Sequence, residues 1–370
     1  MKILMIGPFP DPITGQTIAN QMILTGLMEK GHHVDFIDSD TEKKVNNLSG
    51  QGKFNIKKIL KSLVPIGKGV KNIIFNKYDV VYITPAQSYI GFLKYVPFIN
   101  VAKMMNTACY IHFHGGFVRK MYDELTKEKQ QQIQGHFNKC DGVIVLGESL
   151  RKMFHGIVPD HKVFVCENGV QPEFIIKEDE LEVKVKKLNT ENTMNIIYLS
   201  NLMETKGILH LLKACIKLKE EKVNFHLHVA GMIESGIEKQ VKECFEKLGE
   251  NITYHGVVSG DKKRKMLLNA HIFALPTYYP NEGQPISILE AMTMGGAIVT
   301  TYQGGIGDIF KDKVNGRVCE AQNVDSIKDA LLQCNNNLEQ YIRNNYSSAI
   351  EKYSSENFVS RLYNIVSDKK

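Results

Sequence analysis

Two glutamates, Glu282 and Glu290, lie on either side of a segment whose composition is typical of a ligand-binding turn. Pro285 fits the first position of a helix, where the N–H that proline lacks would have no partner in the helix. Gly283 lets the backbone approach a ligand closely. The N–H groups of residues 283–286 would point out of the helix N-terminus, which favours anions and polar oxygens. Glu282 and Glu290 could then each bind a pair of hydroxyl groups on one ligand.

Three other candidate positions follow short apolar runs that predict strands. His114 precedes two glycines, and Lys206 precedes Gly207 at the start of a helical pattern. Gly15 and Gln16 follow the first apolar run and begin the next helix. His112, two residues before His114, is expected to face the other side of the strand and to lie in the core.

These motifs, spread over nearly the whole chain, resemble glycosyltransferase family 4. The strongest match is residues 278–292, which carry the Glu-x7-Glu signature of that family. The resemblance implies a GT-B fold and a retaining glycosyltransferase of the hexosyltransferase type. It also implies a nucleotide-sugar donor and no metal or cofactor. Asp38-Ser39-Asp40 has the form of a metal-binding motif, but we interpret it as a strand-end turn.

The resemblance also assigns roles to individual residues. Lys206 would bind the donor diphosphate, Glu290 the ribose hydroxyls and Glu282 the sugar, which His114 would position. The implied catalytic residues are His114, Lys206 and Glu282. The implied substrate-binding residues are Gly15, Gln16, Asn201, Lys206, Gly283, Gln284, Pro285, Ile286 and Glu290. Gln16 replaces the second glycine of the family pattern, and Asn201 replaces an arginine.

Short apolar runs alternate with amphipathic helical patterns along the chain, which predicts an α/β protein with parallel sheets. We expect two tandem Rossmann-like domains that face a cleft. The expected domains are residues 1–170 for the acceptor and 195–353 for the nucleotide sugar, joined by a polar linker at 171–194. Residues 354–370 predict a C-terminal helix that could pack back on the first domain. One helix is expected to end at Gly31 and another at Pro65.

Charge is distributed unevenly over the 370 residues. Residues 1–170 contain 21 lysines and arginines against 14 acids, whereas the remainder contains 25 against 26. Nine lysines and no acid lie between Lys43 and Lys77. Within this segment a basic amphipathic helix is predicted, and Lys53, Lys57, Lys58 and Lys61 could bind an anionic membrane surface. An ordinary helix with a solvated lysine face is the alternative, and sparse aromatic residues argue against nucleic acid.

The remaining composition is that of a globular protein, with 43% hydrophobic and 23% charged residues. No apolar run is long enough to span a membrane, and the N-terminal run is too short for a signal peptide. Seven cysteines without paired spacing predict reduced thiols rather than disulfides or a zinc site. We therefore expect a cytoplasmic protein, peripheral on the inner face of the membrane if the lysine segment binds there.

The function expected from these features is sugar transfer to a glycan or lipid-linked glycan, in bacterial surface-polysaccharide synthesis. Two alternatives stay open. The protein could bind a nucleotide sugar without transferring it, or it could be a sugar-nucleotide epimerase of the same fold. The sequence names neither the donor base and sugar nor the acceptor, and it does not show which group replaces the arginine at Asn201.

Overall fold

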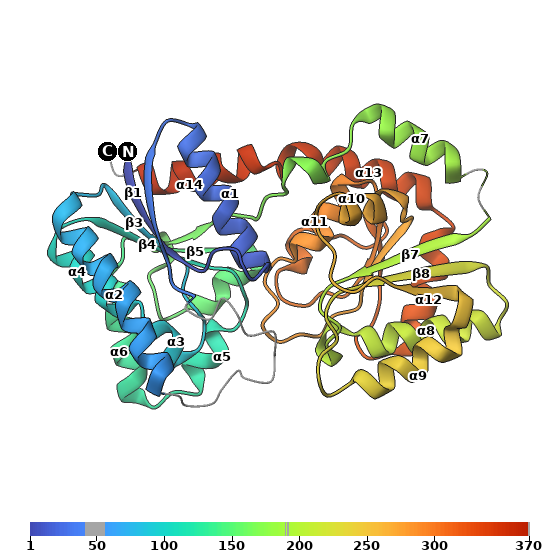
Figure 1. Cartoon of the computed structure of the whole chain (residues 1–370), viewed down its shortest axis with the longest axis horizontal. Helices are drawn as coiled ribbons and strands as arrows, with labels where there is room; N and C mark the ends of the chain where they lie inside the picture. Colours follow the sequence, from blue (N-terminus) through green and yellow to red (C-terminus); the bar gives the residue numbers. More distant parts are fainter. Residues whose placement is uncertain (41–55, 189, 191, 369–370) are drawn as a thin grey trace. The chain divides into compact units, whose positions relative to one another are not determined.

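The computed structural model describes residues 1–40, 56–188, 190 and 192–368, and only the backbone of residues 56–63. The chain forms two compact units (Figure 1). Unit 1 contains Met1–Gly169, Asn281–Gln284 and Ser355–Lys370. Unit 2 contains Val170–Pro280 and Pro285–Ser354. Within the described residues, no helix has the length and apolar character needed to span a bilayer.

Unit 1 is built on a six-stranded parallel sheet with the order β2-β1-β3-β4-β5-β6. Its strands are β1 (Lys2–Gly7), β2 (His33–Asp38), β3 (Val80–Ile83), β4 (Ala108–Phe113), β5 (Gly142–Val145) and β6 (Val163–Val165). Its helices are α1 (Gly15–Glu29), α2 (Ile56–Asn76), α3 (Tyr89–Leu93), α4 (Val96–Met104), α5 (Val118–Asp123), α6 (Lys127–Lys139), the 3₁₀ helices η2 (Glu148–Phe154) and η3 (Asp160–Lys162), and α14 (Ser355–Ser367).

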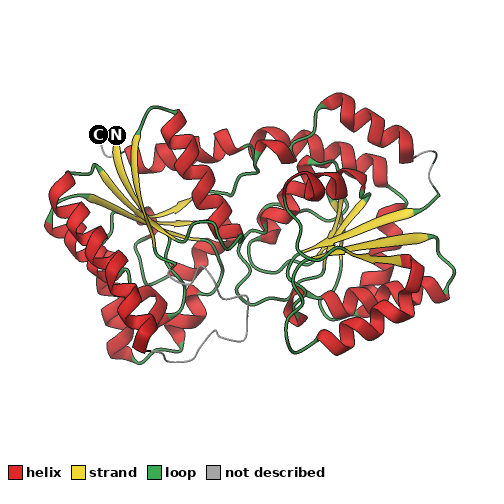
Figure 2. Ribbon diagram, viewed as in Figure 1, coloured by secondary structure: helices red, strands yellow, loops and turns green. Residues whose placement is uncertain are grey.

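Both faces of this sheet are covered by helices (Figure 2). Every residue of β3 and of β5 is buried, which explains why these strands are continuous apolar runs without polar alternation. Helix α1 begins at a capping box: the Thr14 side chain accepts from the Thr17 N–H, and the Thr17 side chain accepts from the Thr14 N–H.

The prediction that a helix ends at Pro65 is wrong, because α2 runs from Ile56 to Asn76 with Pro65 inside it. The apolar stripe continues after the proline: Ile73 is buried, and Ile66 and Val70 pack against the core of unit 1. The burial of this stripe outweighs the loss of one helix hydrogen bond at the proline.

Unit 2 is a second six-stranded parallel sheet, with the order β12-β11-β10-β7-β8-β9. Its strands are β7 (Met194–Leu199), β8 (Phe225–Ala230), β9 (Ile252–Tyr254), β10 (Ile272–Leu275), β11 (Ala297–Thr300) and β12 (Gly316–Val318). Its helices are α7 (Glu178–Leu188), α8 (Ile208–Glu220), α9 (Glu238–Leu248), α10 (Gly260–Asn269), α11 (Ile286–Thr293), α12 (Val324–Asn335) and α13 (Leu338–Lys352). Its 3₁₀ helices are η4 (Pro172–Phe174), η5 (Glu204–Lys206), η6 (Gly249–Asn251) and η7 (Ile306–Asp308).

The segment 171–194, expected as a linker, contains η4 and α7 and belongs to unit 2. Ile176, Leu181 and Val185 are buried in the core of that unit, so the polar composition of the segment reflects only its outer face. The last helix, α14, belongs to unit 1 and packs against α1. All seven cysteines are free thiols and buried.

Candidate functional site

The strand order of unit 2 creates a switch point between β7 and β10. These two strands are neighbours, but the chain leaves β7 toward β8 and reaches β10 only after β9. In open α/β sheets, ligands bind beyond the carboxyl ends of strands at such a point. The loop that follows β7 carries Asn201 and Lys206, and the loop that follows β10 leads to Glu282. The fold therefore makes the carboxyl edge of β7 and β10 the candidate site of unit 2.

The two loops at this edge touch directly. The Tyr278 N–H donates to the Thr205 carbonyl oxygen at 2.8 Å, and the Lys206 ammonium lies 4.8 Å from the centroid of the Tyr279 ring. Gly207 has a φ of +79°, and a Cβ there would lie 2.1 Å from the Pro276 oxygen. Only glycine fits this approach, so Gly207 fixes Lys206 beside the β10 loop.

Asn201 lies on the same β7 loop, and its side chain is exposed. Its carbonyl oxygen accepts a hydrogen bond from the Tyr198 hydroxyl at 3.0 Å, which fixes the backbone at the start of the loop. The loop therefore carries Lys206 as its positive charge, with Asn201 at the position where the family pattern has an arginine.

Glu290 lies in α11 and is 1% exposed. Its Oε1 pairs with the Lys263 Nζ of α10 at 2.6 Å. Burial raises the pKa of the Glu290 carboxyl, and Lys263 opposes that shift. Sequence reasoning missed Lys263, because no pattern linked it to a glutamate 27 residues later. Pro285 is the N-cap residue of α11, one position before the expected place, and Ile286 is the first helical residue.

In unit 1, the segment Asn281–Gln284 lies against the loop after β4. The Gly116 N–H donates to the Asn281 oxygen at 3.1 Å. A Cβ on Gly283 would lie 2.6 Å from the His114 oxygen, so this contact requires glycine. Glu282 is 5% exposed. Unit 1 thus brings Glu282, Gly283 and His114 together.

Gln284 has a structural role within unit 1. Its Oε1 accepts from the Asn168 N–H at 2.7 Å, and its Nε2 donates to the Leu146 oxygen at 3.1 Å. The Asn168 side-chain amide in turn donates to the backbone carbonyl oxygen of Gln284 at 3.0 Å. Both polar groups of the Gln284 side chain are therefore bonded to the backbone, and they fix the segment that carries Glu282.

His112 of β4 and His114, which follows the strand, lie on the same side, so the prediction that they face opposite sides is wrong. Their rings are 4.3 Å apart, as a strand period of two residues requires. His112 is fully buried, and its Nδ1 lies 2.7 Å from the Tyr82 hydroxyl. Burial lowers the pKa of His114 to about 4. His114 is therefore neutral at pH 7.

A pocket of about 210 Å³ lies at the carboxyl ends of β1 and β2 in unit 1. Apolar side chains such as Ile37 and Phe98 line it together with Gln16, Asp40 and Lys94. Gln16 donates to the Thr84 oxygen at 3.0 Å, and Gly15 is the first residue of α1. The pocket therefore has an apolar wall with charged groups of both signs at its rim.

The segment Asp38-Ser39-Asp40 ends β2 as a turn. Asp38 Oδ1 accepts from the N–H groups of Phe9 and Asp40 at 3.3 and 3.0 Å. Within the ranges that the structure describes, no three His, Cys, Asp or Glu side chains group so as to hold a metal ion.

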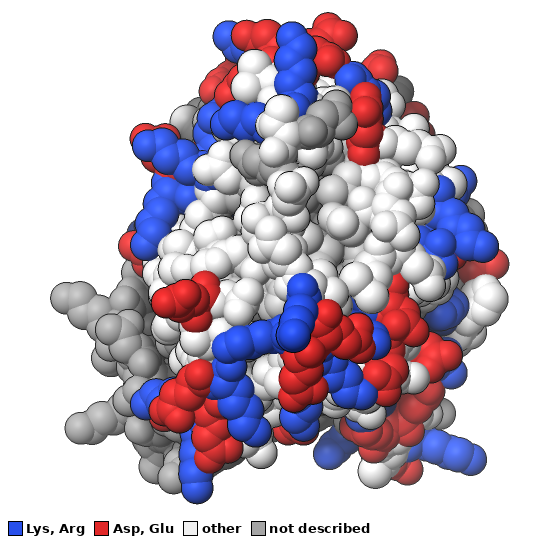
Figure 3. Space-filling model, turned by 90° about the vertical axis from the view of Figure 1, so that its right-hand side faces the viewer, with Lys and Arg blue, Asp and Glu red and all other residues white. Residues whose placement is uncertain are grey.

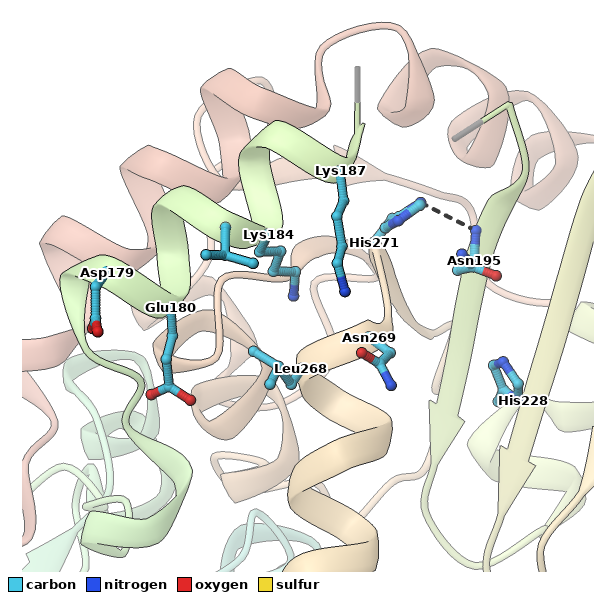
Figure 4. A pocket seen from close by; sticks show the side chains of 10 residues that line it. Asp179, Glu180, Lys184, Lys187, Asn195, His228, Leu268, Asn269 and His271 are labelled. Carbon is cyan, nitrogen blue, oxygen red and sulfur yellow. Dashed lines mark hydrogen bonds between the residues drawn. The ribbon is translucent and has the colours of Figure 1, made fainter. Parts of the chain in front are cut away.

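A second pocket, of about 320 Å³, lies elsewhere in unit 2 (Figure 4). It is lined by Asn195 and His271, at the amino ends of β7 and β10, and therefore lies at the edge opposite the Lys206 loop. Lys184 extends into it from α7 and donates to the Leu267 and Met294 oxygens at 3.3 and 2.9 Å. Burial lowers the pKa of Lys184 to about 7.

Comparison with known proteins identifies a related family. Residues 179–352 match the family of glycosyl transferases group 1. This matched stretch includes Lys206, Lys263 and both glutamates of the Glu-x7-Glu pattern.

Two relatives extend the similarity beyond that stretch. An uncharacterized glycosyltransferase of Methanocaldococcus jannaschii is 26% identical over 99% of this chain and 97% of that protein. The poly(ribitol-phosphate) alpha-N-acetylglucosaminyltransferase of Staphylococcus aureus is 25% identical over 65% of this chain and 46% of that longer protein.

Solved structures confirm the expected fold class. HepE from Anabaena, solved in complex with UDP and with UDP-glucose, superposes with TM-scores of 0.73 and 0.72. Each comparison covers 100% of both chains at 14% identity. The two parallel six-stranded sheets are thus those of GT-B proteins.

Proposed function

We propose that the protein is a retaining glycosyltransferase of family 4 that moves a hexosyl group from a nucleotide sugar to a glycan or lipid-linked glycan. The observation that carries the proposal is the site of unit 2. There the switch point presents Lys206 on a glycine-fixed loop, and α11 presents Glu290 within the stretch that matches glycosyl transferases group 1. HepE binds UDP-glucose on the same fold, which supports a nucleoside diphosphate as the donor leaving group.

In this proposal, the residues of unit 2 hold the nucleotide. Glu290 accepts hydrogen bonds from the ribose hydroxyls. Lys206 stabilises the diphosphate as its negative charge develops, a preorganised charge worth about 2.7–4 kcal/mol per group in studied enzymes. Because Lys206 supplies the positive charge at the leaving group, the proposed reaction needs no metal.

The residues that unit 1 brings together orient the transferred sugar. Glu282 accepts from the sugar hydroxyls, and the neutral His114 positions the ring without acting as a general base, since its pKa of about 4 makes it a weak one at pH 7. The acceptor attacks the face from which the nucleotide departs, and a phosphate oxygen takes its proton. The pocket beside Gln16 and Lys94 has the apolar and charged walls that an amphipathic acceptor requires.

A lipid-linked acceptor for bacterial surface polysaccharide would bring the protein to an anionic membrane. We place that contact on α2 and the lysines before it. Lys53 lies outside the described residues, as do the side chains of Lys57, Lys58 and Lys61. Farther along α2, Lys68 and Lys71 are exposed. On the face of the protein that Figure 3 shows, acidic and basic side chains are instead intermixed rather than gathered into a basic stripe of the kind that binds nucleic acid.

The experiment is donor turnover in Lys206→Ala and Glu290→Ala, with Lys213→Ala as a matched control on an exposed site of α8. Release of nucleoside diphosphate and the glycan product are measured with a panel of nucleotide sugars and acceptors. We expect each site variant to lose about 100-fold or more in turnover while it still folds, whereas the control keeps its activity.

Near-normal turnover in both site variants would overturn the assignment. Two outcomes of the wild-type assay would replace the proposed reaction. Donor binding without transfer to any acceptor would support a nucleotide-sugar-binding protein, and an isomerised sugar nucleotide would support an epimerase.

A further inference from the structure

A short ion pair joins Lys263 and Glu290 in the candidate donor site. Lys263 Nζ lies 2.6 Å from Glu290 Oε1, and the two side chains are 13% and 1% exposed. The ammonium also lies 4.3 Å from the centroid of the Phe174 ring, which covers it on another side. Among the described residues, Lys263 is the only cation paired with Glu290, and it binds the carboxylate through Oε1.

Burial affects the ionisation of the Glu290 carboxyl. A buried carboxylate is destabilised unless a charge compensates it. Burial raises the pKa of Glu290, the nearby Glu173 adds to the rise, and Lys263 is the group that lowers it. Without Lys263, the carboxyl would hold its proton to a higher pH, and a protonated carboxyl is a weaker hydrogen-bond acceptor.

The helices that carry the pair are held together by further contacts. Lys184 donates to the backbone oxygen of Leu267 near the end of α10 and to that of Met294 at the end of α11, so one ammonium joins the two helix ends. The guanidinium of Arg264, the residue next to Lys263, donates to the backbone carbonyl oxygen of Glu173 at 3.0 Å. The Lys184 bonds hold the ends of α10 and α11 together, and the Arg264 bond holds α10 to η4; together they fix the position from which Lys263 reaches Glu290.

We propose that Lys263 is a positioning residue for donor binding: it holds Glu290 Oε1 and keeps the carboxylate charged, so that the remaining oxygen accepts the ribose hydroxyls of the nucleotide. This inference rests on the proposed function, which assigns Glu290 to the ribose. Lys263 itself makes no contact with the donor, and its effect is transmitted only through Glu290.

The test measures nucleotide affinity by calorimetry from pH 6 to pH 9. The affinities of UDP, GDP and ADP for the wild-type protein are compared first, and the nucleotide that binds most tightly is used as the probe for all variants. The variants are Lys263→Met, Lys263→Arg and Glu290→Gln. Lys265→Met is the matched control, because it removes one charge from an exposed position of the same helix.

We expect Lys263→Met to weaken nucleotide binding about tenfold at pH 7, the loss expected when a charged acceptor becomes neutral. Because the remaining carboxyl ionises as the pH rises, this variant should regain affinity toward pH 9. Lys263→Arg should stay within about threefold of the wild type, since it keeps the charge. Lys265→Met should bind the nucleotide as the wild type does. The double variant Lys263→Met/Glu290→Gln should bind the nucleotide no more weakly than Glu290→Gln alone.

Wild-type affinity in Lys263→Met at pH 7 would overturn the inference, and so would an equal loss at every pH, which indicates a packing role. Glu290→Gln separates this failure from that of the proposed function. If Glu290→Gln weakens binding and Lys263→Met does not, only the role of Lys263 fails. If Glu290→Gln leaves the affinity unchanged, the assignment of Glu290 to the nucleotide fails as well.

Discussion

His114 illustrates how burial selects the chemistry of a single residue. Its ring packs against that of His112, and burial lowers the pKa of both imidazoles, that of His114 to about 4. In the unfolded chain a histidine has a pKa of about 6.5. Between these values the unfolded state binds more protons than the folded state, so the free energy of unfolding falls as the pH falls from 6.5 toward 4.

Replacing His114 should therefore flatten the acid dependence of stability. Between pH 7 and pH 4.5, we expect His114→Gln to lose about 2 kcal/mol less unfolding free energy than the wild type, because one lowered pKa is removed. Urea unfolding at the two pH values measures the difference. The exposed His161→Gln serves as the control. Identical losses in the wild type and His114→Gln would contradict the role of burial at this residue.

At the scale of one element, α2 presents an unusual outer stripe. Val64 and Phe75 are 72% and 73% exposed, and the exposed Lys68 and Lys71 lie between them at helical spacing. The opposite stripe packs against the core, as Ile73 shows. Large apolar side chains beside lysines on one solvent face are typical of helices that lie on anionic membranes.

The combined variant Lys68→Glu/Lys71→Glu should bind vesicles that contain anionic phosphatidylglycerol roughly tenfold or more weakly, since each lysine near such a surface contributes about 1 kcal/mol. Vesicle co-sedimentation at low and high salt measures this. The control reverses two exposed lysines of α9, Lys239 and Lys242. If the α2 variant sediments with vesicles as the wild type does, α2 is not the membrane contact.

At the scale of the whole molecule, the chain returns to its first unit at its end. Residues 355–370 belong to unit 1, where α14 packs against α1. A Cβ on Gly26 of α1 would lie 2.6 Å from a methyl carbon of Val359, so the two helices are in close contact. Phe358 of α14 is fully buried and lies against Gly169. Unit 1 is therefore complete only when the last helix is in place.

Truncating this contact should destabilise unit 1 selectively. We expect Phe358→Ala to cost about 3–5 kcal/mol of unfolding free energy, the usual cost of deleting a buried phenylalanine side chain. Hydrogen exchange read by mass spectrometry should show lost protection in β1–β5 and unchanged protection in β7–β11. The exposed Asn364→Ala is the control. Equal protection of β1–β5 in the wild type and Phe358→Ala would contradict this view of α14.

Much of the fold could be predicted from local patterns. Continuous apolar runs such as β3 and β5 arise because both faces of a parallel sheet are covered, and this signal is visible in the residues themselves. The pattern around Glu290 likewise indicates a strand, a turn and a helix. Even so, Pro65 shows that a strong local signal can be overridden when the residues beyond it bury an apolar stripe.

The sequence by itself determined the alternation of strands and helices and the turns that end with Gly207 and Gly283. Only the tertiary structure decided which distant groups meet. It paired Lys263 with Glu290 and bound the side-chain amide of Gln284 to the backbone of Leu146 and Asn168. The physical reason is that strand and helix formation depends on neighbouring residues, whereas buried polar contacts depend on how whole elements pack.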